Sequence, residues 1–129
     1  MIMITEDYVS FETAKLLKEK GFKEKCIATY NLTTDTFEIE EVYQDWTTRW
    51  QVYVSAPTLQ MAMKWLREVH KVDIEVRTCY LNYLKPNDIR YYVGKILKGS
   101  EDVIHTIYAK DSYEEVCEAA IKYCLENLI

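Results

Sequence analysis

Apolar residues in this chain follow two different periods, and the alternation between the two limits the fold. Three segments place apolar side chains three or four positions apart, which is the spacing of one face of an α-helix. Between these segments the spacing falls to two, which is the spacing of one face of a β-strand. The sequence therefore predicts the order helix, two or three strands, helix, two or three strands, helix. Because strands that follow one another after short turns pair in an antiparallel way, we expect an α+β fold with three amphipathic helices packed on one face of an antiparallel sheet.

The first helix is predicted over residues 11–20, and its apolar stripe consists of Phe11, Ala14 and Leu17. Ser10 precedes it and is a preferred N-cap, because its hydroxyl accepts a hydrogen bond from a free backbone amide of the first turn. Gly21 follows it and favours the left-handed conformation that ends many helices, which brings Phe22 against Leu17. Start, stripe and end therefore agree on one short helix.

Two further helices are predicted from the same kind of signal. One follows Pro57, which suits a first helical position, and it ends near His70. The other begins after Asp111 and Ser112, either of which can cap it. The apolar positions are Leu59, Ala62, Leu66 and Val69, widened by Met63 and Trp65, in the former, and Tyr113, Cys117, Ala120 and Cys124 in the latter.

Strands are predicted where apolar and polar residues alternate. These runs lie at Phe37 and Ile39, at Trp50, Val52 and Val54, at Ile74 and Val76, at Tyr91 and Val93, and over residues 103–108. Residues 31–35 and 98–102 are rich in turn-forming residues, so each is predicted to close a hairpin.

The size and charge of the chain limit its class. A chain of 129 residues has room for one domain, so we assign residues 1–129 to a single α+β domain. A net charge of -5 disfavours binding to nucleic acid and to anionic membranes, since both depend on Lys and Arg. The N-terminus lacks the pattern of a signal peptide and no apolar run approaches the length of a membrane span. We therefore expect a cytoplasmic protein whose four cysteines are reduced thiols.

No motif in the sequence indicates catalysis or cofactor binding. The glycines are isolated, so no phosphate-binding loop can be built from them, and no C-x-x-C pair is present. The spacing of His70 and His105 does not suggest a metal site, and the cysteines sit at apolar positions typical of a core. We expect no catalytic residue, no metal and no cofactor. The alternative that stays open is an enzymatic or small-molecule-binding domain without a recognisable motif.

Two groups of charged residues are predicted to be solvated faces. One is acidic and consists of Asp35, Glu38, Glu40, Glu41 and Asp45, on or beside a predicted strand. The other is mainly basic and consists of Lys64, Arg67 and Lys71, with Glu68 beside them on the second predicted helix. Contact with an acidic partner is the alternative for the basic group.

Aromatic residues provide the candidate site. Tyr43, Trp46 and Tyr53 are crowded into one short stretch together with Arg49. Exposed Tyr, Trp and Arg side chains are frequent anchors of protein interfaces, so these four residues are the predicted interaction surface. A second aromatic cluster or a contact between copies of the chain are alternatives, and stacking on bases of single-stranded nucleic acid is another.

Three helical segments resemble a known group of proteins. The segments cover residues 10–22, residues 56–70 and the C-terminal part from residue 112 to residue 129. Together they resemble small uncharacterised proteins of phage and prophage regions in anaerobic gut bacteria. The resemblance implies an accessory protein of a mobile element and carries no activity. The favoured hypothesis is therefore a non-catalytic module that binds an unidentified partner protein. Assembly into a homo-oligomer is compatible with this hypothesis. The first alternative is a module that binds nucleic acid with an aromatic face of its sheet.

Overall fold

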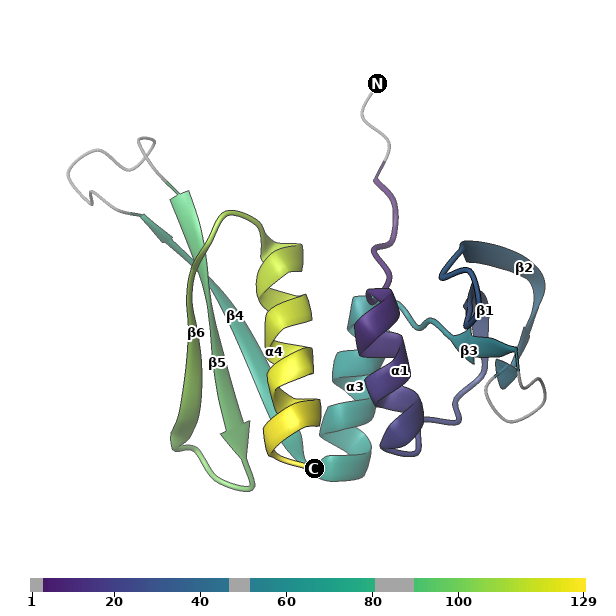
Figure 1. Ribbon diagram of the computed structural model, residues 1–129. Coiled ribbons are helices and arrows are strands. Elements are labelled where there is room, and N and C mark those ends of the chain that lie inside the picture. Colours follow the sequence, from purple (N-terminus) through teal and green to yellow (C-terminus); the bar gives the residue numbers. More distant parts are fainter. Residues whose placement is uncertain (1–3, 47–51, 81–89) are drawn as a thin grey trace.

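The computed structural model describes residues 4–46, 52–80 and 90–129, and Figure 1 shows their arrangement. Three helices lie in the middle of the described part, with one antiparallel three-stranded sheet on each side. The elements are α1 (Phe11–Glu19), β1 (Cys26–Asn31), β2 (Phe37–Gln44), β3 (Tyr53–Ser55), α3 (Leu59–His70), β4 (Val72–Tyr80), β5 (Arg90–Lys98), β6 (Val103–Lys110) and α4 (Tyr113–Asn127). The α+β class predicted from the sequence is confirmed.

The expectation of one sheet with all helices on one face is wrong. The strands form two separate sheets, with the orders β2-β1-β3 and β4-β5-β6. Each strand pairs within its own group, and α3 stands between the two groups in the chain. The helices then serve both sheets, because α4 packs on β4, β5 and β6 while α1 packs against β3. Of the predicted strand around Trp50, only Tyr53–Ser55 forms β3, and Trp50 itself lies outside the described residues.

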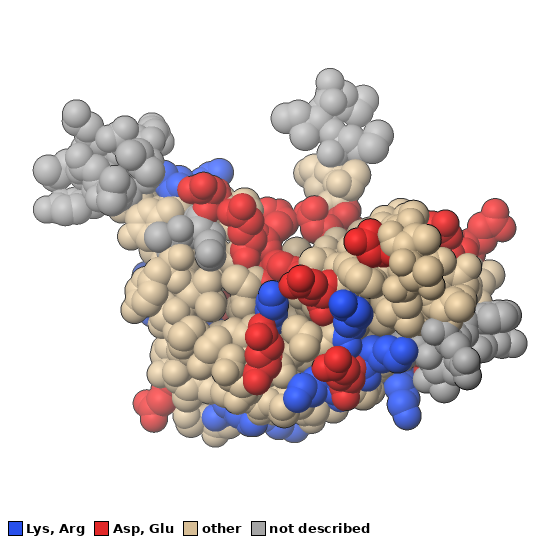
Figure 2. Space-filling view, viewed as in Figure 1, with Lys and Arg blue, Asp and Glu red and all other residues tan. Residues whose placement is uncertain are grey.

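The three described helices run in the same direction, as Figure 1 shows. In the described part of the chain, three strands lie between α1 and α3 and three between α3 and α4. The N-termini therefore share one end of the molecule, with acidic residues such as Glu12 and Glu114 in first turns and Lys18 and Arg67 in last turns. Figure 2 shows the same separation, with Asp and Glu gathered in the upper part and most Lys and Arg in the lower part. This arrangement complements the helix dipoles.

The predicted caps of α1 are confirmed. The Ser10 hydroxyl accepts a hydrogen bond from the Thr13 amide at 3.2 Å. At the other end Gly21 has a φ of 90°, which residues other than glycine adopt only with strain. The Phe22 amide donates to the Leu17 carbonyl at 2.9 Å, as expected of a helix that ends in a left-handed glycine.

The start of α3 differs from the prediction. Its N-cap is Thr58, whose hydroxyl accepts from the Met61 amide at 3.1 Å, so Pro57 lies before the helix and not in its first turn. The Pro57 carbonyl accepts instead from the Val9 amide at 3.0 Å, which holds the proline in an extended connection. Val69 was expected in the buried stripe of this helix but is 53% exposed.

Close contact between α4 and β5 depends on a glycine. A Cβ atom added to Gly94 would lie 2.6 Å from Cγ1 of Val116, which is fully buried on α4. The glycine therefore lets the helix approach the sheet more closely than any other residue would allow. The cap of α4 is confirmed at Ser112, whose hydroxyl accepts from the Glu115 amide at 3.1 Å.

Candidate protein-interaction surface

The four residues of the predicted interaction surface do not share one exposed face. Tyr43 lies on β2 and is 62% exposed, as an interface anchor must be. Tyr53 begins β3 and is half-buried. Arg49 lies outside the described residues. Trp46 is only 7% exposed, so the prediction of an exposed anchor at this position is corrected.

Trp46 is held in place by contacts with the small sheet. Its indole Nε1 donates to the Cys26 carbonyl at 2.8 Å, and its amide donates to the Ser55 hydroxyl at 3.1 Å. Its ring meets that of Tyr53 edge to face at 6.2 Å. Ser55 pairs with Thr29 across the sheet, and both are buried. Trp46 therefore packs on this sheet and belongs to the hydrophobic core.

The exposed apolar side chains near Tyr43 belong to the edge strand β2. They are Phe37 at 38%, Ile39 at 61%, Val42 at 54% and Tyr43 at 62% exposure. We call these four residues together the β2 surface. Within the described residues β2 pairs with β1 on one side, and its other side is an open sheet edge. An open edge presents backbone donors and acceptors that can pair with another strand.

A bulge interrupts the second half of β2. Ala28 pairs with Ile39, whereas Cys26 pairs with Gln44, so residues 40–43 lie opposite Ile27 alone. Such a bulge interrupts the regular alternation of faces and bends the strand. Val42 and Tyr43 lie within the bulge and are both exposed, as are Phe37 and Ile39 in the regularly paired part of the strand.

The β2 surface is acidic as well as apolar. The strand contains Glu38, Glu40 and Glu41 and no Lys or Arg. The Glu40 carboxylate forms a hydrogen bond within the sheet, since its Oε1 accepts from the Thr29 hydroxyl at 3.3 Å. Glu38 and Glu41 are exposed. An added strand would therefore meet apolar side chains and carboxylates together.

A groove of about 280 Å³ adjoins the β2 surface at Tyr43. Apolar side chains from three further segments line it, namely Tyr8, Ile27, Pro57 and Met61. Its walls come from the N-terminal segment, β1 and the start of α3, so the fold places a concave apolar region beside an exposed edge strand.

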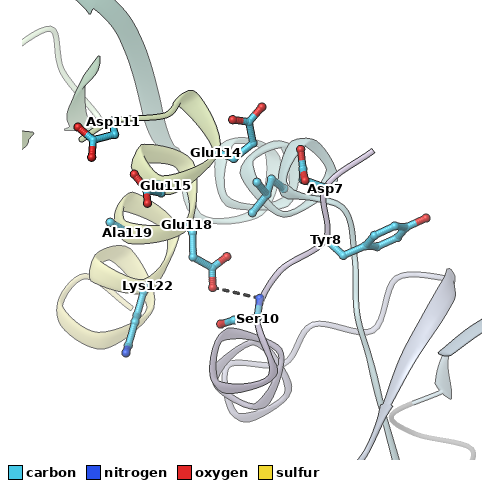
Figure 3. A pocket seen from close by; sticks show the side chains of 10 residues that line it. Asp7, Tyr8, Ser10, Asp111, Glu114, Glu115, Glu118, Ala119 and Lys122 are labelled. Atoms are coloured by element: carbon cyan, nitrogen blue, oxygen red, sulfur yellow. Dashed lines mark hydrogen bonds between the residues drawn. The ribbon is translucent and has the colours of Figure 1, made fainter. Parts of the chain in front are cut away.

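A larger groove, of about 700 Å³, lies between the N-terminal segment and α4, and Figure 3 shows its acidic lining. Glu118 points toward Ser10, and its Oε1 accepts from the Ser10 amide at 3.1 Å. The same oxygen accepts from the Thr13 hydroxyl at 2.6 Å. This carboxylate therefore caps the N-terminus of α1, and a role in the fold accounts for it. Among the described residues no group of three His, Cys, Asp or Glu side chains is arranged to hold a metal ion.

Three of the four thiols have the properties of core residues. Burial raises the pKa of Cys26 to about 12, that of Cys117 to about 11 and that of Cys124 to about 12. Thiols with such pKa values stay protonated at neutral pH and are poor nucleophiles.

Both histidines pack against aromatic rings on different elements. His70 ends α3 and meets the ring of Trp65 at 4.7 Å, while His105 on β6 stacks on Tyr123 at 3.7 Å. Burial, with a smaller contribution from Lys98, lowers the pKa of His70. Its Nε2 is buried and has no hydrogen-bond partner in the part of the chain that the structure describes.

The chain matches no protein-family model, no curated protein and no solved structure. Within residues 4–46, 52–80 and 90–129, no helix is long and apolar enough to cross a membrane.

Proposed function

We propose that this protein is a non-catalytic protein-binding module that accepts an extended segment of a partner protein along the open edge of β2. The observation that carries the proposal is the exposure of Ile39, Val42 and Tyr43 on a strand whose second edge pairs with no strand among the described residues. Strand addition uses both features, since the backbone supplies affinity and alternate side chains supply specificity. The groove beside Tyr43 gives one side chain of the added segment a place to bind.

The charge of β2 selects a basic partner. Glu38 and Glu41 are exposed on the strand, and like charges placed opposite one another destabilise a strand pair. A second copy of β2 would bring its own glutamates to this edge. A partner segment with Lys or Arg between apolar residues fits better, and the phosphates of a nucleic acid do not fit this edge.

The biological setting belongs to the same proposal. The likeness of the helical segments to phage- and prophage-associated proteins supports an accessory role in a mobile element, in the cytoplasm. The partner is then a protein of the host cell or of the mobile element itself.

The experiment compares two edge strands of the same protein. Tagged wild type, Ile39→Lys and Val103→Lys are used to capture partners from a nuclease-treated lysate of the source bacterium. Val103 is 44% exposed on β6, the edge of the other sheet, so it is a matched control. We expect a partner that wild type and Val103→Lys retain and that Ile39→Lys loses.

Charge reversal tests the choice of partner. Replacing Glu38 and Glu41 together by Lys should weaken capture of a basic partner while the apolar side chains stay in place. Capture that is unchanged by Ile39→Lys, or lost equally with Val103→Lys, would contradict a site on β2.

A further inference from the structure

A second groove, of about 530 Å³, lies between α3 and the connection from α1 to β1. Its apolar wall is a stripe of Met61, Trp65 and Val69, four residues apart along α3. Val69 is the exposed end of this stripe, at 53%, whereas Met61 is half-buried and Trp65 is part of the core at 6% exposure. At the rise of an α-helix the stripe is about 12 Å long.

The rim of this groove is mainly basic. Its charged lining residues are Lys23, Lys25 and Lys64 with Glu24 and Glu68. Glu68 is engaged by Arg67, whose Nε lies 3.8 Å from its carboxylate. Within the described residues the three lysines form no ion pair, and all three are exposed. Three lysines and two glutamates give the lining a net charge of +1, in a chain with a net charge of -5.

Other lysines at this end of the molecule have a role in the fold. Lys20 donates to the Ile129 carbonyl at 2.8 Å, and Lys98 donates to the Leu128 carbonyl at 2.6 Å. Both therefore satisfy carbonyl groups at the end of α4, as cations near helix C-termini do. No such contact within the described residues accounts for the lysines at the groove.

We propose that this groove binds an acidic segment of a partner protein, with an apolar side chain against Met61 and Val69 and carboxylates beside Lys23, Lys25 and Lys64. An extended chain advances about 3.3 Å per residue, so about four residues span the stripe. A segment of that length reaches Met61, Val69 and the lysines on both sides of the groove at once, whereas a compact anion would use the lysines and leave Val69 exposed.

This second site differs from the β2 surface in the charge that it selects. The β2 surface is acidic and favours a basic segment, whereas the groove selects an acidic one. Met61 lines both this groove and the groove beside Tyr43, so the two sites adjoin. The test must therefore separate them.

The test is a titration of the isotope-labelled protein with three eight-residue synthetic peptides, followed by amide chemical shifts. One peptide alternates Leu with Glu, the second alternates Leu with Lys, and the third alternates Ser with Glu. We expect the Leu–Glu peptide alone to shift the amides of residues 23–25 and 61–69. Lys23→Glu combined with Lys64→Glu should weaken its binding about tenfold, since attraction becomes repulsion.

Two controls make the result specific. Lys15→Glu changes an exposed lysine of α1 outside the groove and should leave the affinity unchanged. Ile39→Lys should also leave it unchanged, which separates this site from the proposed function of β2. Unshifted groove amides, equal shifts of residues 23–25 and 64–69 with the Leu–Lys or Ser–Glu peptide, or an equal loss in Lys15→Glu would overturn the proposal. The amide spectra of the variants verify that each is folded.

Discussion

The carboxylate of Glu118 and the hydroxyl of Thr13 form a hydrogen bond of 2.6 Å that joins α4 to the first turn of α1. Thr13 is fully buried, and the same Glu118 oxygen also accepts from the Ser10 amide. The carboxylate lies where the free amides and the dipole of α1 favour an anion. One of the carboxylates that line the acidic groove in Figure 3 therefore caps α1, although it belongs to the distant helix α4.

Replacing Glu118 should therefore destabilise the fold. Glu118→Ala leaves the buried Thr13 hydroxyl without its acceptor and should lower the free energy of unfolding by about 2 kcal/mol. Glu118→Gln keeps an acceptor oxygen and should cost about half as much. Urea denaturation measures both, with Glu126→Ala, exposed in the last turn of α4, as the control. Equal stability of Glu118→Ala and the control would contradict the cap.

Gly94→Ala should be destabilising because the added Cβ would meet Val116 at 2.6 Å. Valine on a helix has little rotamer freedom, so relief requires a shift of α4, and the expected cost is about 2 kcal/mol. Combining Gly94→Ala with Val116→Ala removes the clash. The double variant should then lose less than the sum of the single losses in thermal or urea unfolding, and simple additivity would count against the contact.

Trp46→Phe should destabilise the small sheet. The change removes the indole donor of the hydrogen bond to the Cys26 carbonyl and leaves that acceptor buried, at a cost of about 2 kcal/mol. Tyr43→Ala, on the exposed part of β2, should change the free energy of unfolding by less than about 0.5 kcal/mol. If the two variants unfold at the same urea concentration, the burial assigned to Trp46 is wrong.

His70 should make stability depend on pH. Its pKa in the folded protein is lowered from an ordinary value of 6.5, chiefly by burial. The unfolded chain therefore binds the proton more readily than the folded protein. The stability that neutral His70 contributes is complete above pH 6.5 and is lost as the pH falls through the pKa of the folded state. The difference in unfolding free energy between wild type and His70→Gln should accordingly shrink between pH 7.5 and pH 5. A difference that is constant over this range would show that burial does not affect the histidine.

The helices could be predicted from the sequence because their signals are local. Ser10 and Gly21 act within one turn of the residues that they cap, and both assignments are confirmed. Ser112 caps α4 in the same local way, and this assignment is also confirmed. The predicted start of α3 is wrong because the Pro57 carbonyl accepts a hydrogen bond from the amide of Val9, a residue remote in the sequence.

The pairing of strands into sheets and the exposure of the site residues could not be predicted, because both depend on contacts between residues far apart in the sequence. Alternation of apolar and polar residues predicts a strand with one apolar face. It does not predict which strands pair in the same sheet. Trp46 is an example, since the carbonyl that holds it lies 20 residues earlier in the chain. Of the predicted surface, Tyr43 is exposed as expected. Ile39 was missed, because alternation alone suggested a core position for it.

Hydrogen exchange of the complex with a purified partner tests the central claim most directly. An added strand would form hydrogen bonds with the outward-facing amides of β2, so exchange in residues 37–44 should slow on binding. Amides of the control edge, β6, should exchange as they do in the free protein. Protection of β2 alone is the predicted result, and a bound partner that leaves the β2 amides unprotected would contradict strand addition at this edge.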